Sequence, residues 1–331
     1  MENLLEVRNL SVSYSVGTGA RVQAVADASF LISAGEIVGV LGESGSGKST
    51  LASALLAMSP FNATVGSGAV LLLGTDLLKL NDEELRRCRG KNLALICQEP
   101  STALHPTIRV GAQIEEVLRA HTDYNRAKRR DVVLALLNSV FSSEAERIGH
   151  SYPHQLSGGQ RQRVAIAQAI ACKPSLLIAD EPTASLDSVT QQEIMQLLRK
   201  LQTELQLAIL FITHTPELLV GFANRIFVMY AGKLVETGRT SDLFRSPLHP
   251  YTRALLDCRP RLHPPKEISH GGRLPVIQGE APDLTACVTG CDFEPRCPER
   301  IGVCRERKPG ITRVGENSQV RCFKFDLENR N

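Results

Sequence analysis

The stretch "GESGSGKST", residues 42–50, decides the fold. It follows "GEIVGVLG" (35–42), which predicts a strand, and it opens "KSTLASALLAMS" (48–59), which has the composition and period of a helix. It fits G-x-x-x-x-G-K-[ST] with Gly42, Gly47, Lys48 and Ser49. Glycines let such a loop turn its backbone N–H groups toward phosphate oxygens, in conformations that side chains would block. The stretch therefore predicts a nucleoside triphosphate site.

The residue types of this loop assign roles within that site. Lys48 is expected to neutralise charge on the β- and γ-phosphates, and the Ser49 hydroxyl is expected to bind Mg²⁺. The helix that follows adds the positive end of its dipole. The remaining loop residues expected to contact the nucleotide are Ser44, Gly45 and Thr50.

A second acidic stretch completes the expected site. In "SLLIADEP" (175–182) an apolar strand ends at Asp180, a carboxylate that can hold Mg²⁺ directly or through water. Glu181 follows and can polarise the attacking water. Two acids after a strand are often only a turn or a helix cap, but the phosphate loop favours the functional interpretation.

A second Ser/Gly turn lies in "LSGGQRQRVAIAQAI" (156–170). A turn of this kind at a helix N-terminus can bind an anion. The loop at 42–50 already holds this chain's own phosphate, so the second turn has a role only toward another molecule's nucleotide. The residues expected to do so are Ser157, Gly158, Gly159 and Gln160.

The rest of the chain predicts an α/β fold. "KNLALICQ" (91–98) and "LAILFITH" (207–214) are short apolar runs typical of strands buried on both faces of a parallel sheet. "LEVRNLSVSY" (5–14) also reads as a strand, and residues from about 102 to 165 read as mainly helical. Prolines accumulate after residue 240. We therefore expect one domain over 1–240 and a smaller one over 241–331.

The order of the three motifs resembles the ATP-binding cassette (ABC) ATPases over about residues 5–240. The resemblance implies a parallel-core sheet carrying the phosphate loop, an antiparallel β subdomain and a helical subdomain. It also implies ATP hydrolysis with Mg²⁺. In that family two cassettes pair head to tail, and each ATP lies between one subunit's phosphate loop and the other's LSGGQ.

Four further positions match that family individually. Gln98 resembles the glutamine that senses Mg²⁺ and touches the membrane subunit, and His214 resembles the switch histidine that contacts the γ-phosphate and orients water with Glu181. Asp187 resembles the acid that communicates across the dimer, and Tyr14 the aromatic that stacks on adenine. The family usually places Asp after the histidine, whereas this chain continues with Thr215 and Pro216. The text after "EPT" also departs mildly, at Ala184–Asp187.

The tail narrows the resemblance. "SPLHPYTRALLDCRP" (246–260) and "GCDFEPRCPERIGVC" (290–304) are similar to the C-terminal extension of dipeptide, oligopeptide and nickel uptake ATPases. This implies a peripheral subunit on the cytoplasmic membrane face that powers import. Its implied partners are a second identical or homologous cassette, two transmembrane permeases and an extracytoplasmic binding protein. An exporter ATPase or a soluble non-transport ABC ATPase leaves residues 246–304 unexplained.

Five of the nine cysteines lie in the last 45 residues. Cys291, Cys297, Cys304 and Cys322 match positions where some members of the family bind a [4Fe–4S] cluster. Four thiolates also suit tetrahedral Zn²⁺, and a metal-free tail is a third alternative. The absence of C-x2-C pairs favours the cluster. We expect a structural role, with redox control of the ATPase as the alternative; Cys287 is a surrogate ligand or a bystander.

Composition limits the partners. A net charge of +3 over 331 residues argues against a dedicated nucleic-acid surface, and "NRAKRRD" (125–131) is most simply a solvated helix face. No run reaches the roughly 18 apolar residues of a membrane span. The N-terminus lacks the apolar stretch of a signal peptide, so a cytosolic chain is expected.

Overall fold

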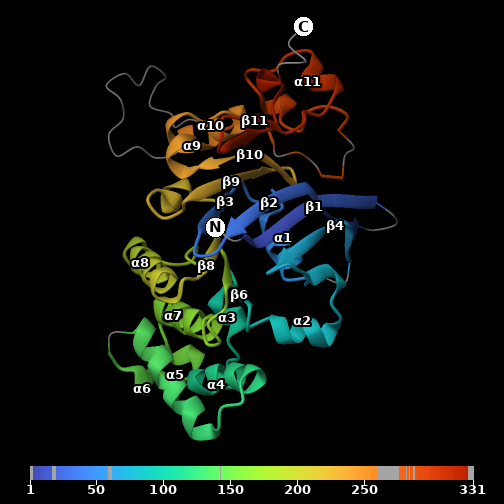
Figure 1. Ribbon diagram of the computed structural model, residues 1–331. Coiled ribbons are helices and arrows are strands. Elements are labelled where there is room, and N and C mark those ends of the chain that lie inside the picture. Colours follow the sequence, from blue (N-terminus) through green and yellow to red (C-terminus); the bar gives the residue numbers. More distant parts are fainter. Residues whose placement is uncertain are drawn as a thin grey trace, which may run out of the picture.

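A computed structural model describes the protein over residues 3–16, 20–58, 62–141, 143–258, 276–280, 282, 284–285 and 288–326. A large sheet runs through the middle of the molecule, and a smaller antiparallel sheet lies beside it (Figure 1). A group of helices lies at one end of the molecule and the C-terminal extension at the other (Figure 1).

The large sheet has the strand order β11-β12-β10-β9-β3-β8-β7-β6. Strands β9, β3, β8, β7 and β6 are parallel, and they are almost entirely buried because helices and the second sheet cover their faces. Their bounds are β3 Ile37–Leu41, β6 Leu93–Ile96, β7 Leu176–Asp180, β8 Ala208–Thr213 and β9 Arg225–Tyr230. Antiparallel strands continue this sheet on one side: β10 Lys233–Arg239, β11 Thr312–Val314 and β12 Ser318–Val320.

The smaller sheet has the order β2-β1-β4-β5 and is antiparallel throughout. Its strands are β1 Asn3–Val16, β2 Ala20–Ser33, β4 Ala63–Leu72 and β5 Thr75–Asp76. Leu5 and Ile32 of this sheet share one apolar core with Val40 of β3 and Leu51 of helix α1 (Lys48–Leu55). The core therefore fixes the phosphate-loop helix between the two sheets.

Helices cover the other face of the large sheet and extend beyond its β6 edge. They share a second core with that sheet, to which Leu41, Ile209 and Phe211 also contribute. The region expected to be helical over 102–165 holds α4, α5, α6 and the first part of α7. The helix bounds are α2 Asp82–Cys88, α3 Pro100–Ala103, α4 Val110–His121, α5 Arg126–Val140, α6 Ala145–His150, α7 Gly158–Ala169 and α8 Ser188–Leu205.

The C-terminal extension continues the large sheet. Strand β12 pairs with β10, joining Glu236 to Val320, so the sheet crosses the boundary expected at 240/241. The helices on this side are α9 Thr240–Arg245, α10 Pro250–Asp257, the short 3₁₀ turn η4 Glu294–Arg296 and α11 Val303–Glu306. The division at 240/241 stays a prediction. Within the described ranges, none of the helices has both the length and the apolar character needed to cross a bilayer.

Candidate nucleotide-binding site

A cavity of about 870 Å³ lies beyond the C-terminal ends of the parallel strands. Strands β3, β7 and β8 end at Leu41, Asp180 and Thr213, and the loops that follow form its walls. Ligands of open α/β sheets bind at this edge. The lining residues are Ala24, Glu43, Ser44, Gly45, Gly47, Lys48, Ser49, Thr50, Gln98, Glu181, His214 and Leu255.

The phosphate loop has the shape that the sequence predicts. Gly45 and Gly47 lie at φ 78° and 104°, in the left-handed region that favours glycine. Lys48 is 5% exposed, and its Nζ donates to the carbonyl oxygens of Gly42 and Glu43 at 2.9 Å each. Burial lowers the pKa of Lys48. Phosphate oxygens are better partners for this ammonium group than two neutral carbonyls, because they carry charge.

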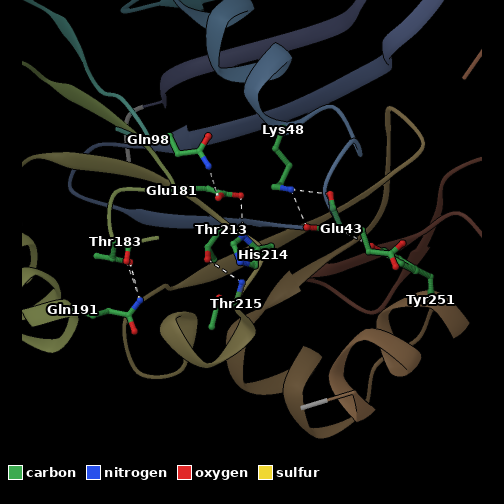
Figure 2. A network of polar contacts seen from close by, with 11 residues as sticks. Glu43, Lys48, Gln98, Glu181, Thr183, Gln191, Thr213, His214, Thr215 and Tyr251 are labelled. Carbon is green, nitrogen blue, oxygen red and sulfur yellow. Dashed lines mark hydrogen bonds and ion pairs between the residues drawn. The ribbon is translucent and has the colours of Figure 1, made fainter. Parts of the chain in front are cut away.

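Three side chains expected to take part in hydrolysis contact one another (Figure 2). Glu181 Oε2 accepts a hydrogen bond from Gln98 Nε2 at 3.1 Å, and its Oε1 lies 3.0 Å from His214 Nδ1. A carboxylate can only accept, so Nδ1 carries the hydrogen of this bond and leaves Nε2 facing away from Glu181. Glu181 has φ 46°, in the left-handed region that costs a non-glycine residue free energy.

His214 is followed by Thr215, where the family usually has aspartate, and the chain then enters a turn. The Thr215 N–H donates to Thr213 Oγ1 at 2.9 Å, and Pro216 begins the 3₁₀ turn η3 (Pro216–Leu219). Pro is well suited to the first position of such a turn because its fixed φ matches and no N–H is lost. The substitution therefore leaves His214 in contact with Glu181 (Figure 2).

Asp180 and Ser49 lie together, as a magnesium site requires. Burial raises the pKa of the Asp180 carboxyl, and a hydrogen bond from the Ser49 side chain offsets part of this rise. Asp180 Oδ1 is buried and has no hydrogen-bond partner within the described part of the chain. A buried carboxylate oxygen without a partner fits a cation or its bound water, so these two residues suit Mg²⁺.

Tyr14 lies beside the phosphate-loop helix and does not line the cavity. Its hydroxyl is 3.1 Å from Thr50 Oγ1. The contact places the ring near the nucleotide site, and stacking of this ring on adenine stays a prediction.

The second Ser/Gly turn and Asp187 act locally as helix caps. Ser157 and Gln160 form a reciprocal capping box at the start of α7, and Asp187 accepts hydrogen bonds from the N–H groups of Val189 and Thr190 at the start of α8. Neither the turn nor Asp187 lines this chain's own cavity. This placement is compatible with contacts to a nucleotide held by a second subunit, which stay a prediction.

The structure adds residues that the motifs did not identify. Leu255 of α10 lines the cavity, so the C-terminal extension forms part of its wall. Glu43 also lines it, and its carboxylate pairs with Arg296 of the extension. No local sequence signal marks these long-range contacts, although "HPYTRALL" (249–256) marked α10 as unusual.

Four tail cysteines lie close together, and Cys287 lies outside the described residues. The Cys291 N–H donates to the Cys304 carbonyl at 2.7 Å. Burial raises the pKa of Cys322, and the nearby charge of Cys297 acts in the same direction. Burial raises the pKa of Cys291 to about 12, and the charges of Cys304, Asp292 and Cys322 act in the same direction. The cysteines that the structure describes are free, and no group of three or more His, Cys, Asp or Glu among described residues is arranged to hold a single metal ion.

Comparisons with known proteins match this chain to ATP-binding transport proteins. Residues 25–184 match the ABC transporter family, and residues 235–304 match the oligopeptide/dipeptide transporter C-terminal region. The dipeptide transport ATP-binding protein DppD of Bacillus subtilis is 40% identical, over 98% of this chain and 96% of the relative. The oligopeptide transport ATP-binding protein OppD of Salmonella typhimurium is 41% identical, over 97% of this chain and 93% of the relative.

A solved structure shares the same cassette. It is the dimeric ATP-binding cassette MJ0796 in a post-hydrolysis state bound to ADP and Pi. It superposes with a TM-score of 0.64 and 31% identity, over 71% of this chain and 98% of that chain. The chain therefore belongs to the ABC transporter ATPases, within the family of dipeptide and oligopeptide transport ATP-binding subunits.

Proposed function

We propose that this chain hydrolyses ATP to power the import of peptides or a related small solute through a membrane ABC transporter. The observation that carries this proposal is the contact of Gln98 and His214 with Glu181 at the wall of a cavity that also holds the phosphate loop. The relatives that match along nearly the whole chain are named as peptide transport ATP-binding proteins.

The geometry of Glu181 supports the role of general base. Its two oxygens each accept one hydrogen bond, and a carboxylate has about four acceptor positions, so each oxygen can still accept a bond from water. Gln98 and His214 fix the direction of those remaining positions. Glu181 thus orients the water and receives its proton, while Lys48 and the loop N–H groups neutralise the phosphates.

The buried carboxylate is the proposed metal ligand. Asp180 and Ser49 would hold Mg²⁺, and Gln98 lines the same cavity as Ser49. Mg²⁺ supplies charge neutralisation on the transferred phosphoryl group.

The position of residues 157–160, at the start of α7, supports the proposal that two cassettes pair. Ser157, Gly158, Gly159 and Gln160 lie outside the chain's own cavity, so their proposed ligand is ATP held by a second identical or homologous cassette. We further propose that the pair works beneath two permease subunits at the cytoplasmic membrane face, supplied by an extracytoplasmic binding protein.

Replacing Glu181 by Gln tests the hydrolytic role. The expected result is ATP binding as in the wild type and turnover reduced by about 100-fold or more, because the amide cannot accept a proton. The matched control is Glu204→Gln, on the exposed face of α8, where the carboxylate pairs with Lys200 at 3.9 Å. Undiminished turnover in Glu181→Gln would refute this assignment.

Uptake of labelled dipeptides and oligopeptides tests the transport role. Cells that lack the chain are expected to take up less peptide, with recovery by the wild type and none by Glu181→Gln. Accumulation of solute inside those cells, in place of loss of uptake, would point instead to an exporter.

We also propose that Cys291, Cys297, Cys304 and Cys322 hold a [4Fe–4S] cluster. Burial raises the pKa of the Cys291, Cys297 and Cys322 thiols, and a bound cation would favour their thiolate forms. The sequence spacing of these cysteines, without the C-x2-C pairs of common zinc sites, favours the cluster over tetrahedral Zn²⁺. The cluster would pin the extension.

Anaerobic purification followed by iron, sulfide and zinc determination tests this assignment. The expected result is about four irons and four sulfides per chain. Cys304→Ser should lower both, whereas Cys258→Ser, a half-buried cysteine of the α10 end, should not. Zinc alone, or no metal, would refute the cluster.

A further inference from the structure

An acidic side chain lies in the phosphate loop itself. Glu43 directly follows Gly42, lines the nucleotide cavity and keeps 29% of its side chain exposed. ATP brings several negative charges to this loop. A carboxylate beside the phosphates in a partly enclosed cavity repels them more strongly than it would in bulk water, because the local dielectric is lower. Without a partner, Glu43 would oppose Lys48.

The partner comes from the C-terminal extension. Arg296 Nη1 donates to Glu43 Oε2 at 2.8 Å, and Nη2 donates to Oε1 at 3.1 Å. This bidentate arrangement fixes both the charge and the direction of the carboxylate. The Arg296 side chain is only 5% exposed, and its hydrogen bonds to Glu43 raise its pKa. Arg296 therefore stays charged and cannot easily turn away.

Other contacts hold Arg296 and Glu43 in this position. Arg296 Nε donates to the Gln278 carbonyl at 3.1 Å, and its guanidinium lies 5.8 Å from the centre of the Tyr230 ring. The Glu43 backbone N–H donates to the Tyr251 hydroxyl of α10 at 2.9 Å (Figure 2). The extension thus contacts both the backbone and the side chain of one phosphate-loop residue.

We infer that Arg296 is a positioning residue for ATP: it neutralises the Glu43 carboxylate and holds it away from the bound phosphates. The inference rests on the proposed binding of ATP in this cavity and deepens it. It gives the extension a direct part in nucleotide affinity. The effect belongs to binding, so it should change the dissociation constant and the KM for ATP and leave kcat nearly unchanged.

Titration of the full-length chain with a fluorescent ATP analogue tests this inference. Arg296→Met keeps the bulk of the side chain and removes its charge, and we expect about tenfold weaker binding, equivalent to about 1.4 kcal/mol. The second-site variant Glu43→Gln/Arg296→Met should bind within about twofold of the wild type. Removing the carboxylate can restore affinity only if unpaired charge was the cause of the loss.

Two more variants complete the experiment. Arg305→Met removes an exposed arginine of the same extension, paired with Glu294 at 2.9 Å, and should bind ATP as the wild type does. Glu43→Gln alone should bind ATP at least as tightly as the wild type, and this variant keeps the test valid if Arg296→Met fails to fold.

The outcomes separate this inference from the proposed function. Unchanged affinity in Arg296→Met, or no recovery in the double variant, overturns the role of Arg296 while ATP binding stands. Weaker binding by Glu43→Gln alone also overturns it. No nucleotide binding by the wild type would instead overturn the proposed function.

Discussion

Gly47 lies at φ 104°, where the phosphate loop closely approaches Ala24 of strand β2. A Cβ atom built on Gly47 would lie 2.1 Å from the Ala24 carbonyl oxygen, whereas one on Gly45 would have no atom within 4 Å. Both positions would strain a side chain, but only Gly47 would also force backbone atoms apart. The two glycines therefore differ in kind, in agreement with the motif, which requires glycine at position 47 and leaves position 45 free.

The first prediction concerns the stability of the nucleotide-free chain. Gly45→Ala should lower the free energy of unfolding by about 1–2 kcal/mol, the usual cost of a left-handed conformation. Gly47→Ala should lower it by at least about 3 kcal/mol, because the collision with Ala24 adds to that strain. Denaturant unfolding of both variants checks this. Equal losses in the two variants would show that β2 moves aside freely.

The meeting of the three side chains proposed for hydrolysis could be predicted from the sequence, because each lies a fixed distance after a strand end. Gln98, Glu181 and His214 follow β6, β7 and β8, so their meeting follows from the parallel order of those strands. The partners of Glu43 could not be predicted in this way. Tyr251 and Arg296 lie 208 and 253 positions further along the chain, and no local pattern encodes such pairs.

A buried histidine, His249, caps the N-terminus of helix α10. His249 is 2% exposed, and its Nδ1 accepts the Tyr251 N–H at 3.0 Å, which caps the helix. Burial lowers the pKa of His249 to about 4, and the charge of Glu299 opposes this only in part. The backbone N–H groups of Leu248 and His249 both donate to Glu236 at 2.8 Å. The start of α10, and with it Tyr251, is thus fixed by polar contacts.

The second prediction is a pH dependence of stability. The unfolded chain binds a proton at His249 near pH 6.5, but the native chain does so only near pH 4, so stability falls as pH is lowered between these values. About 2 kcal/mol should be lost between pH 7.5 and pH 5.0 from this group. His249→Asn keeps a capping acceptor that does not titrate. Between pH 7.5 and pH 5.0 its stability should therefore fall by about 2 kcal/mol less than that of the wild type.

Unfolding of the wild type and of His249→Asn at both pH values measures this difference. Glu236, whose pKa is raised by burial, is present in both proteins, so its titration cancels to first order. The same change of stability with pH in the two proteins would contradict the assignment to His249.

The buried strands were predictable at the scale of elements because they combine short apolar runs with turn residues at their ends. The runs 91–98, 175–182 and 207–214 contain β6, β7 and β8. The extent of the sheet was not predictable. Strands β11 and β12 are short and half-exposed, and only pairing with β10 gives them their structure.

At the scale of the whole molecule, the C-terminal extension forms part of the cavity proposed to bind the nucleotide. The sequence predicted a smaller domain over 241–331, and in the structure Leu255 of that region lines the cavity and Arg296 pairs with Glu43. Arg296 precedes Cys297, whose N–H donates to the Glu294 carbonyl at 3.1 Å across the turn η4. A cluster bound to Cys297 would therefore also fix the backbone of Arg296, from which the side chain extends.

The third prediction joins the proposed cluster to ATP binding. Removing iron with a chelator under anaerobic conditions should release residues 291–304 and loosen the Arg296–Glu43 pair, so ATP should bind about as weakly as it does to Arg296→Met. Titration with a fluorescent ATP analogue, before and after iron removal, measures the change without relying on turnover. The same treatment of Arg296→Met should produce no further loss, since the pair is already absent.

Glu43→Gln distinguishes the origin of this effect. If iron loss acts through the unpaired carboxylate, the Glu43→Gln chain should keep its ATP affinity when the iron is removed. If iron loss acts by unfolding the extension as a whole, the wall at Leu255 and the Tyr251 contact are lost as well, and Glu43→Gln should weaken like the wild type. Unchanged affinity of the wild type after complete iron removal would show that other contacts of the extension hold Arg296 in place. Those contacts are the Gln278 carbonyl and the Tyr230 ring, which do not depend on the cysteines.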